Sequence, residues 1–227
     1  LFSNGVHHGT NRYEIGDNQL KIEYANQFDF KYQWSNEHIG IVLNPFAQYI
    51  SDFISITPID SIQDSYKVYN YTQYEKVEIK GVEFNLHYHP HQLHNLHIEQ
   101  SYSFLHTKNK DDVYGLALVP ANSIKTKVLF DFNKYEKIIK YKFDYISIYH
   151  VYKFQQNSYA EYESLTPEYN VINLQLGLKF NDKLHCVLSL NNLFNEVYSP
   201  HISRVRGVAG GVPNPGRFFN INLKYEF

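Results

Sequence analysis

The sequence predicts an all-β protein, an antiparallel transmembrane β-barrel that crosses the membrane with its strands. Three observations lead to this fold class. Apolar and polar residues alternate with a period of two along most of the chain, as in strands with two different faces. Aromatic residues make up 17% of the chain, with 21 Tyr and 16 Phe, and lipid-facing strands end in aromatic girdles. Several predicted strands are also much longer than the roughly five or six residues usual in globular proteins.

The alternation is clearest in three stretches of the chain. Between residues 20 and 34 the predicted apolar face holds Leu20, Ile22, Tyr24, Asn26, Phe28, Phe30, Tyr32 and Trp34. Between 139 and 151 it holds Ile139, Tyr141, Phe143, Tyr145, Tyr149 and Val151, against Lys140, Lys142, Asp144 and His150. At the end of the chain it holds Phe219, Ile221, Leu223, Tyr225 and Phe227. A helix with these sequences would carry charge on every side.

We predict about nine strands, joined alternately by short turns and long loops. The strands are expected at 18–34, 38–54, 66–89, 94–107, 121–133, 137–153, 167–180, 184–192 and 216–227. Tight polar turns are expected at 35–37, 90–93, 133–136 and 181–183. Longer loops are expected at 1–17, 55–65, 108–120, 154–166 and 193–215. In an outer-membrane barrel the short turns are periplasmic and the long loops extracellular.

A soluble β-sandwich would also show alternation, but the composition favours a membrane barrel. The polar faces carry charges in strand after strand, while the apolar faces are rich in Tyr and Phe rather than Val, Leu and Ala. The mean hydropathy is −0.45, and no stretch approaches the roughly 18 apolar residues of a helical membrane span. The net charge of −2 offers no basic surface, so no nucleic-acid partner is expected.

The chain is expected to be a piece of a longer protein. It begins with Leu1 and contains no Met, and its lone Cys186 permits no internal disulfide. Bacterial single-chain barrels have even strand numbers, and an open strand edge in hydrocarbon leaves backbone groups without hydrogen bonds. An odd number of strands therefore predicts that further strands precede this sequence.

Short motifs follow one another along the chain. The first are Leu1-Phe2-Ser3-Asn4-Gly5-Val6-His7 and Tyr13-Glu14-Ile15-Gly16-Asp17. Further along are Gly81-Val82-Glu83, Leu118-Val119-Pro120, Asn192-Leu193-Phe194-Asn195 with Tyr198, and Pro215-Gly216-Arg217. In this order and spacing they resemble the barrel of TonB-dependent outer-membrane receptors over the whole chain. Ile22 departs from the family, which often has Pro after Leu-Lys at this point.

The resemblance implies a roughly 22-stranded barrel closed by an N-terminal plug. Residues 1–227 would be the C-terminal part of the barrel domain, without the plug domain or the TonB box. Such receptors sit in the outer membrane of Gram-negative bacteria and import ferric siderophores, haem, cobalamin or metal ions, and the first loop resembles a branch that imports zinc. The implied partners are outer-membrane lipid, the TonB complex through the plug, the barrel-assembly machinery and a metal chelate or other nutrient. No cofactor is implied. A passive porin or adhesin-like barrel, or a truncated remnant without transport, is the alternative.

The last strand has a further implied role. In outer-membrane proteins that the chain resembles, a terminal Phe preceded by apolar residues at every second position is read by the barrel-assembly machinery. The residues that fit this pattern are Phe219, Ile221, Leu223, Tyr225 and Phe227. Such a strand must present an apolar face to lipid and pair along its edge when the barrel closes.

Histidines suggest metal sites in two places. Five of the 12 histidines lie close together around a predicted periplasmic turn, namely His87, His89, His91, His94 and His97. Alternation places three of them, His87, His89 and His97, on the lumen side, where imidazoles could chelate a transition metal. We interpret them instead as solvated turn and lumen histidines. His7 and His8 lie in an external loop and are candidate substrate ligands, although two imidazoles are too few for a closed site.

Arginines and tyrosines of the external loops complete the candidate substrate-binding residues. Arg204 and Arg206 can pair with an anionic siderophore, or else serve as salt-bridge or capping groups within their loop. Tyr159 and Tyr162 can stack on an aromatic chelate, or else belong to the aromatic girdle. No nucleophile elbow, zinc-protease motif or phosphate-binding glycine loop is present in the sequence, so we expect no enzyme and predict no catalytic residue.

Overall fold

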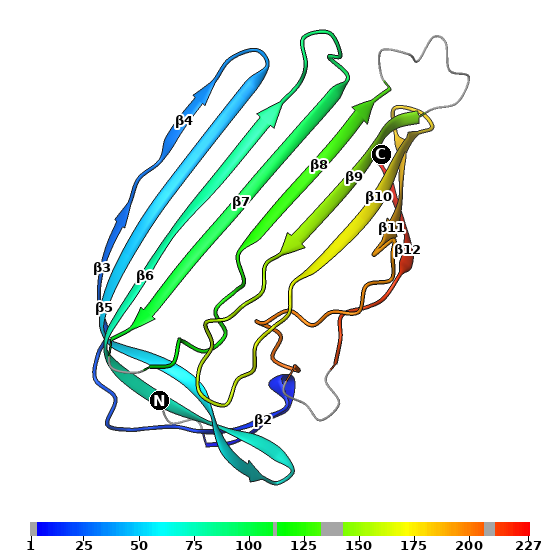
Figure 1. Cartoon of the computed structure of the whole chain (residues 1–227). Coiled ribbons are helices and arrows are strands. Elements are labelled where there is room, and N and C mark those ends of the chain that lie inside the picture. Colours follow the sequence, from blue (N-terminus) through cyan, green and yellow to red (C-terminus); the bar gives the residue numbers. More distant parts are fainter. Residues whose placement is uncertain (1–3, 111–112, 133–142, 207–211) are drawn as a thin grey trace.

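The computed structural model describes residues 4–110, 113–132, 143–206 and 212–227. In these residues 12 strands form one strongly curved sheet (Figure 1). A single turn of 3-10 helix, η1 (His8–Thr10), precedes β2. No helix of the described ranges is long and apolar enough to cross a membrane. Residues 1–3 of the first motif, the predicted turn 133–136 and residues 137–142 of the next predicted strand lie outside the described residues.

The predicted antiparallel architecture is confirmed. The strands are β1 (Asn4–His7), β2 (Arg12–Ile15), β3 (Tyr24–Asp29), β4 (Tyr32–Ser35), β5 (Ile39–Gln63), β6 (Tyr66–Tyr88), β7 (Leu96–Asn109), β8 (Ser123–Asp131), β9 (Phe143–Lys153), β10 (Tyr169–Lys179), β11 (Leu184–Asn191) and β12 (Phe218–Tyr225). From β5 to β12 each strand pairs antiparallel with the next, and β3 and β4 both pair with β5. All nine predicted strands are therefore present, the first of them in two pieces.

The predicted strand 18–34 is shorter and broken. Residues 18–23 lie outside any strand, and the remainder is interrupted between β3 and β4. The interruption lies opposite Pro45. The Phe30 N–H donates to the Pro45 carbonyl at 3.0 Å, but the ring nitrogen of Pro45 has no hydrogen to donate back. One hydrogen bond of the ladder is therefore missing, and regular pairing resumes at Tyr32.

The segment 55–65 was predicted to be a loop, which is wrong, because it is the outer end of a long hairpin. β5 continues to Gln63, and the chain reverses through Asp64 and Ser65, whose φ angles are 50° and 70°. Two consecutive residues with positive φ form the type I′ turn that fits the twist of a hairpin. The hairpin thus extends beyond the end of β7, and there β2 pairs in parallel with the free edge of β6. This pairing covers an edge that would otherwise be open.

The pairing register divides the sheet into an apolar and a polar face. One row across the apolar face, from β7 to β12, is Ile98, Val128, Ile148, Leu174, Leu190 and Phe219. The row beside it on the polar face is His97, Leu129, Ser147, Gln175, Ser189 and Asn220. Apolar side chains that are exposed or half-buried in unbroken rows suit contact with lipid rather than water. The polar face, on which the loop 113–120 folds, lines the lumen.

The face assignment of the last strand is confirmed, and the assignment of β9 is wrong. In β12, Phe219, Ile221, Leu223 and Tyr225 share the apolar face, and Phe227 lies beyond the strand. In β9 the predicted apolar residues Tyr145, Tyr149 and Val151 lie on the polar face, opposite Gly177, Asn173 and Val171. A bulge at Gly177/Leu178 pairs Phe143 with Leu178 and skips Asp144. Odd-numbered residues of β9 after the bulge therefore face the polar side, whereas Phe143 before it faces the apolar side.

The buried apolar core is small and lies near the rim that carries the long loops. Leu116 and Val119 of the loop 113–120 pack on Ile50 and Val77 of the lumen face. Leu116 is 3% exposed and Val119 6%. This packing fixes the loop across the mouth of the lumen, close to the loops that follow β9 and β11 (Figure 1).

Candidate functional site

The candidate site is a cavity of about 110 Å³ among the long loops. It is lined by β2, by the outer ends of β5 and β6, and by the loops that follow β7, β9 and β11. Its lining residues are Arg12, Pro58, Lys67, Tyr69, Leu118, Tyr162, Glu163, Ser164, His201, Ser203, Arg204 and Arg206. Four of these side chains are Lys or Arg and one is a carboxylate, so the walls are predominantly cationic.

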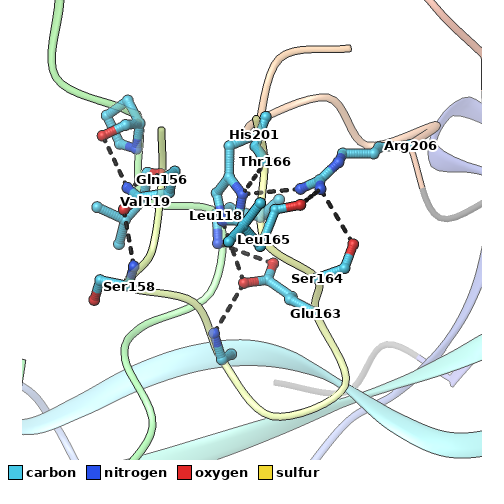
Figure 2. Close-up of polar contacts among 12 residues, drawn as sticks. Leu118, Val119, Gln156, Ser158, Glu163, Ser164, Leu165, Thr166, His201 and Arg206 are labelled. Atoms are coloured by element: carbon cyan, nitrogen blue, oxygen red, sulfur yellow. Dashed lines mark hydrogen bonds and ion pairs between the residues drawn. The ribbon is translucent and has the colours of Figure 1, made fainter. Parts of the chain in front are cut away.

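Glu163 lines this cavity and connects the surrounding loops to one another (Figure 2). Its carboxylate accepts the backbone N–H of Ala160 at 3.0 Å and that of Leu118 at 3.1 Å. The His201 Nε2 lies 3.5 Å from the same carboxylate. Burial acts to raise the pKa of Glu163, but His201 and the two N–H donors outweigh it and lower this pKa below its ordinary value of 4.5. Glu163 is therefore an ionised carboxylate held by fixed donors.

His201 is held in one tautomer. Its Nδ1 lies 2.9 Å from an Arg206 nitrogen and 2.7 Å from the Thr166 hydroxyl. A guanidinium only donates, so Nδ1 accepts, and an N–H of the ring is on Nε2, which faces Glu163 without a hydrogen bond. Arg206 also donates to the Ser164 hydroxyl at 3.1 Å and to the Leu165 carbonyl. Burial lowers the pKa of Arg206, and Glu163 opposes this shift.

Gln156 fixes the loop after β9 to the loop after β7 (Figure 2). Its side chain donates to the carbonyls of Val119 at 3.0 Å and Pro120 at 3.2 Å, and it accepts the Ser158 N–H at 3.0 Å. Gly115 permits the close approach of the two loops, because a Cβ there would lie 2.5 Å from the Ser158 Oγ. The cavity wall is thus built from hydrogen-bonded loops rather than from an apolar core.

A buried ion pair supports the opposite wall. Arg12 and Glu14 lie two residues apart on β2, so their side chains share a face. They are 2.6 Å apart and only 6% and 5% exposed. Tyr71 donates to the second oxygen of Glu14 at 3.2 Å, and the Arg12 guanidinium lies 5.0 Å from the centre of the Tyr69 ring. Burial acts to raise the pKa of Glu14, but Arg12 and Tyr71 lower it overall.

Three of the six predicted binding residues, Tyr162, Arg204 and Arg206, line the cavity. The other three do not line it. The ring of His7 contacts the Thr10 hydroxyl at 3.1 Å, and the ring of His8 lies edge-on to Tyr66. Tyr159 uses its carbonyl to accept the Gly115 N–H. Ligand binding by any of the six remains a prediction.

No sequence pattern identifies Glu163 and His201, because their contact joins loops far apart along the chain. Arg12 was likewise missed, although Glu14 belongs to the second motif. A search for charged pairs two residues apart in a short alternating segment would have found Arg12 and Glu14.

Comparison with known families decides the class of the protein. The family model for the β-barrel of TonB-dependent receptor-like proteins matches residues 1–193. The chain belongs to this family. It is therefore an outer-membrane β-barrel, and the lipid-facing interpretation of the apolar face agrees with this assignment.

Solved structures support the barrel fold. The copper transporter OprC aligns with a TM-score of 0.80 at 18% identity, covering 93% of this chain and 33% of that one. The FrpB iron transporter from Neisseria meningitidis aligns with a TM-score of 0.67 at 17% identity, covering 97% and 34%. The siderophore receptor PirA from Acinetobacter baumannii gives 0.65 at 18%, covering 95% and 33%. The chain thus spans about a third of each structure. The search of curated proteins found no match.

The motifs shared with TonB-dependent receptors have structural roles in this chain. Asn192, which follows β11, adopts a positive φ of 51°. Its amide donates to the Glu196 carbonyl at 2.9 Å and accepts the Glu196 N–H at 2.8 Å. The Asn195 side chain accepts the Arg217 N–H at 2.9 Å, and the ring of Tyr198 stacks on Tyr169 with centroids 4.4 Å apart. The motif therefore folds the last long loop back toward the start of β12.

At the opposite rim, the predicted lumen placement of the turn histidines is confirmed. His87 pairs with Gly40 and Glu99 on the polar face, and His97 pairs with Leu129. His89 follows β6 in the same alternation, and its N–H donates to the His38 carbonyl at 2.9 Å. The turn therefore gathers imidazoles at the lumen end of the barrel wall.

Proposed function

We propose that this chain forms part of the wall and outer vestibule of a receptor that imports a scarce nutrient as an anionic metal complex. A ferric siderophore is the ligand class that fits best. Energy would come through the TonB complex, which acts on a plug domain outside this sequence. Membership of the TonB-dependent receptor family and the position of the cavity among the long, extracellular loops support the proposal.

The charge of the cavity is the observation that carries the proposal. Its carboxylate, Glu163, already accepts two backbone N–H groups and lies 3.5 Å from the His201 ring. The Arg204 side chain, by contrast, is exposed and has no ion-pair partner among the described residues. Lys67 donates only to the Tyr162 carbonyl, at 2.9 Å. These two cations give the cavity a positive field, which attracts an anionic ligand and can hold it by charge-assisted hydrogen bonds.

The test uses the full-length receptor and a radiolabelled ferric tris-catecholate. Arg204→Gln removes one cation from the cavity and should weaken binding and uptake about tenfold, because a hydrogen bond to a charged group contributes about 1.5–3 kcal/mol. Arg217→Gln, which removes a charge outside the cavity, is the matched control and should leave uptake unchanged. If the Arg204 variant takes up the ferric complex as well as the control, the cavity is not the binding site.

Deletion of the TonB gene separates this proposal from its alternatives. Uptake through an energy-coupled receptor should stop without TonB. A passive porin-like barrel would continue to conduct the ligand, and a remnant without transport would show no uptake in either strain.

A further inference from the structure

Histidines from two separate segments form one cluster at the rim of short turns. His38 precedes β5, His87 lies near the end of β6, and His89, His94 and His97 belong to the β6–β7 turn and the start of β7. Ring centroids of His38 and His89 are 5.0 Å apart, and those of His87 and His97 are 5.5 Å apart. The antiparallel pairing of β5 with β6 brings His38 to the other histidines.

The ligand atoms of this cluster lie within reach of a single ion. They form two groups, His38 with His89 and His94, and His87 with His89 and His97. Within each group all ligand nitrogens lie within 4.8 Å of one another. Zinc–nitrogen bonds are about 2.0–2.1 Å long, so nitrogens on one tetrahedral ion lie about 3.4 Å apart. The imidazole nitrogens therefore need to approach one another by up to about 1.5 Å. Small side-chain rotations supply such a movement.

Two imidazole nitrogens of the cluster have no hydrogen-bond partner among the described residues. The Nδ1 atoms of His38 and His89 are buried and have no hydrogen-bond partner there. A buried polar atom without a partner costs about 1–3 kcal/mol, and such atoms are rare in native proteins. A metal ion bound at Nδ1 removes this penalty, so the unpaired nitrogens point to a ligand.

The chemistry of the donors selects the ion. Each group consists of imidazoles alone, a donor set that suits Zn²⁺ or Cu²⁺ and is poor for Mg²⁺ or Ca²⁺. The nearby carboxylate of Glu99 is already paired with Lys127 at 3.3 Å. Three protein ligands leave a coordination position open, as in sites that exchange their ligand rather than in closed structural sites.

We infer that the short-turn rim binds one divalent transition-metal ion, Zn²⁺ or Cu²⁺, through His89 together with either His38 and His94 or His87 and His97. Because both groups share His89, one ion can occupy either position and can pass between them by exchange of two imidazoles. The site faces the lumen at its periplasmic end. The inference does not rest on the proposed function, because it concerns a bare ion at the rim opposite the loop cavity.

The experiment is calorimetric titration of purified, tag-free full-length receptor with Zn²⁺ alone and with Cu²⁺ alone. The wild type should bind one ion at this rim. His89→Gln breaks both groups and should lower the affinity at least tenfold. The pair His38→Gln/His94→Gln leaves the other group intact and should lower it less, as should His87→Gln/His97→Gln.

His91→Gln is the control, because His91 contacts the rings of His38 and His94 but belongs to neither group. It should bind metal like the wild type, and the heat-modifiable mobility of every variant reports correct folding. If folded His89→Gln binds either ion as tightly as wild type, or if His91→Gln loses as much affinity, the assignment is wrong. Uptake of the ferric tris-catecholate should be unchanged in His89→Gln, which separates this result from the test of the loop cavity.

Discussion

The two rims of the barrel wall both carry polar clusters, but the clusters differ in how their polar atoms are satisfied. In the loop cluster behind the cavity, Glu163 accepts two backbone N–H groups and Arg206 donates to three partners. At the short-turn rim, buried nitrogens of His38 and His89 have no partner among the described residues. In the loop cluster the His201 Nε2 also lacks a hydrogen bond within the described part of the chain, but it lies 3.5 Å from the Glu163 carboxylate. The unpaired nitrogens of the short-turn rim belong to groups made of imidazoles alone. The comparison therefore assigns a structural role to Glu163 and Arg206 at one rim and metal binding to the imidazoles at the other.

The largest expected effect concerns the buried pair that supports the cavity wall. Glu14→Gln leaves the Arg12 guanidinium buried without its carboxylate, and breaking a buried pair in this way costs about 3–5 kcal/mol. Native-state hydrogen exchange of β1 and β2 should show local opening that is easier by this amount. Glu37→Gln, at an exposed turn position, should leave β1 and β2 unaffected. If the amides of β1 and β2 exchange at the same rate in both variants, the ion pair does not hold these strands in place.

The next largest loss of stability is expected from a charge placed on the barrel wall between the two rims. Leu174→Arg places a charge on the apolar face and should destabilise the full-length receptor in lipid vesicles by about 2–4 kcal/mol if it lies near mid-bilayer. Gln175→Arg, on the neighbouring residue of the lumen face, should have little effect. Equilibrium folding into vesicles measures both, and the reverse ranking would contradict the face assignment.

Acid should loosen the loop cluster. The pKa of Glu163 is lowered in the folded protein, so its ionised form adds stability at pH values above its ordinary pKa of 4.5. This contribution decreases below about pH 4.5 and is lost as the pH falls through the lowered folded value. Limited proteolysis with an acid-active protease should cut residues 156–166 faster under these conditions. Glu163→Gln should remove the pH dependence, whereas Glu161→Gln, at an exposed position, should retain it.

The smallest effect is expected at the histidine rim without metal. His38→Gln and His89→Gln break no side-chain hydrogen bond of the described residues at the buried nitrogen, so each should change the free energy of unfolding by less than about 0.5 kcal/mol. Denaturant unfolding of metal-free receptor checks this. A loss comparable to that of Glu14→Gln would mean that these histidines are structural.

The sequence predicted the wall of the barrel better than it predicted the loops. Strict alternation placed the residues of β12 correctly because nothing interrupts their pairing. It failed in β9, where a bulge opposite Gly177 reverses the faces and two tyrosines turn toward the lumen. It also failed at the break between β3 and β4, because the cause, Pro45, lies on the partner strand.

The candidate site was predicted only in part for a related reason. Arg204, Arg206 and Tyr162 could each be chosen for their chemistry and their place in a loop. The contact of Glu163 with His201 depends on how two loops pack, and no local pattern encodes it. The proximity of His38 to His89 follows only from the register of β5 and β6.

The most direct test of the contrast between the rims is hydrogen exchange of the full-length receptor with and without Zn²⁺. The account predicts slower exchange of the turn 88–96 when Zn²⁺ is present, because binding stabilises the bound state in proportion to ligand concentration. Exchange in the loops 156–166 and 201–206 should not change, since they lie at the rim opposite the histidine cluster. Equal protection of both rims, or no protection of the turn, would contradict the assignment of binding to the histidine rim.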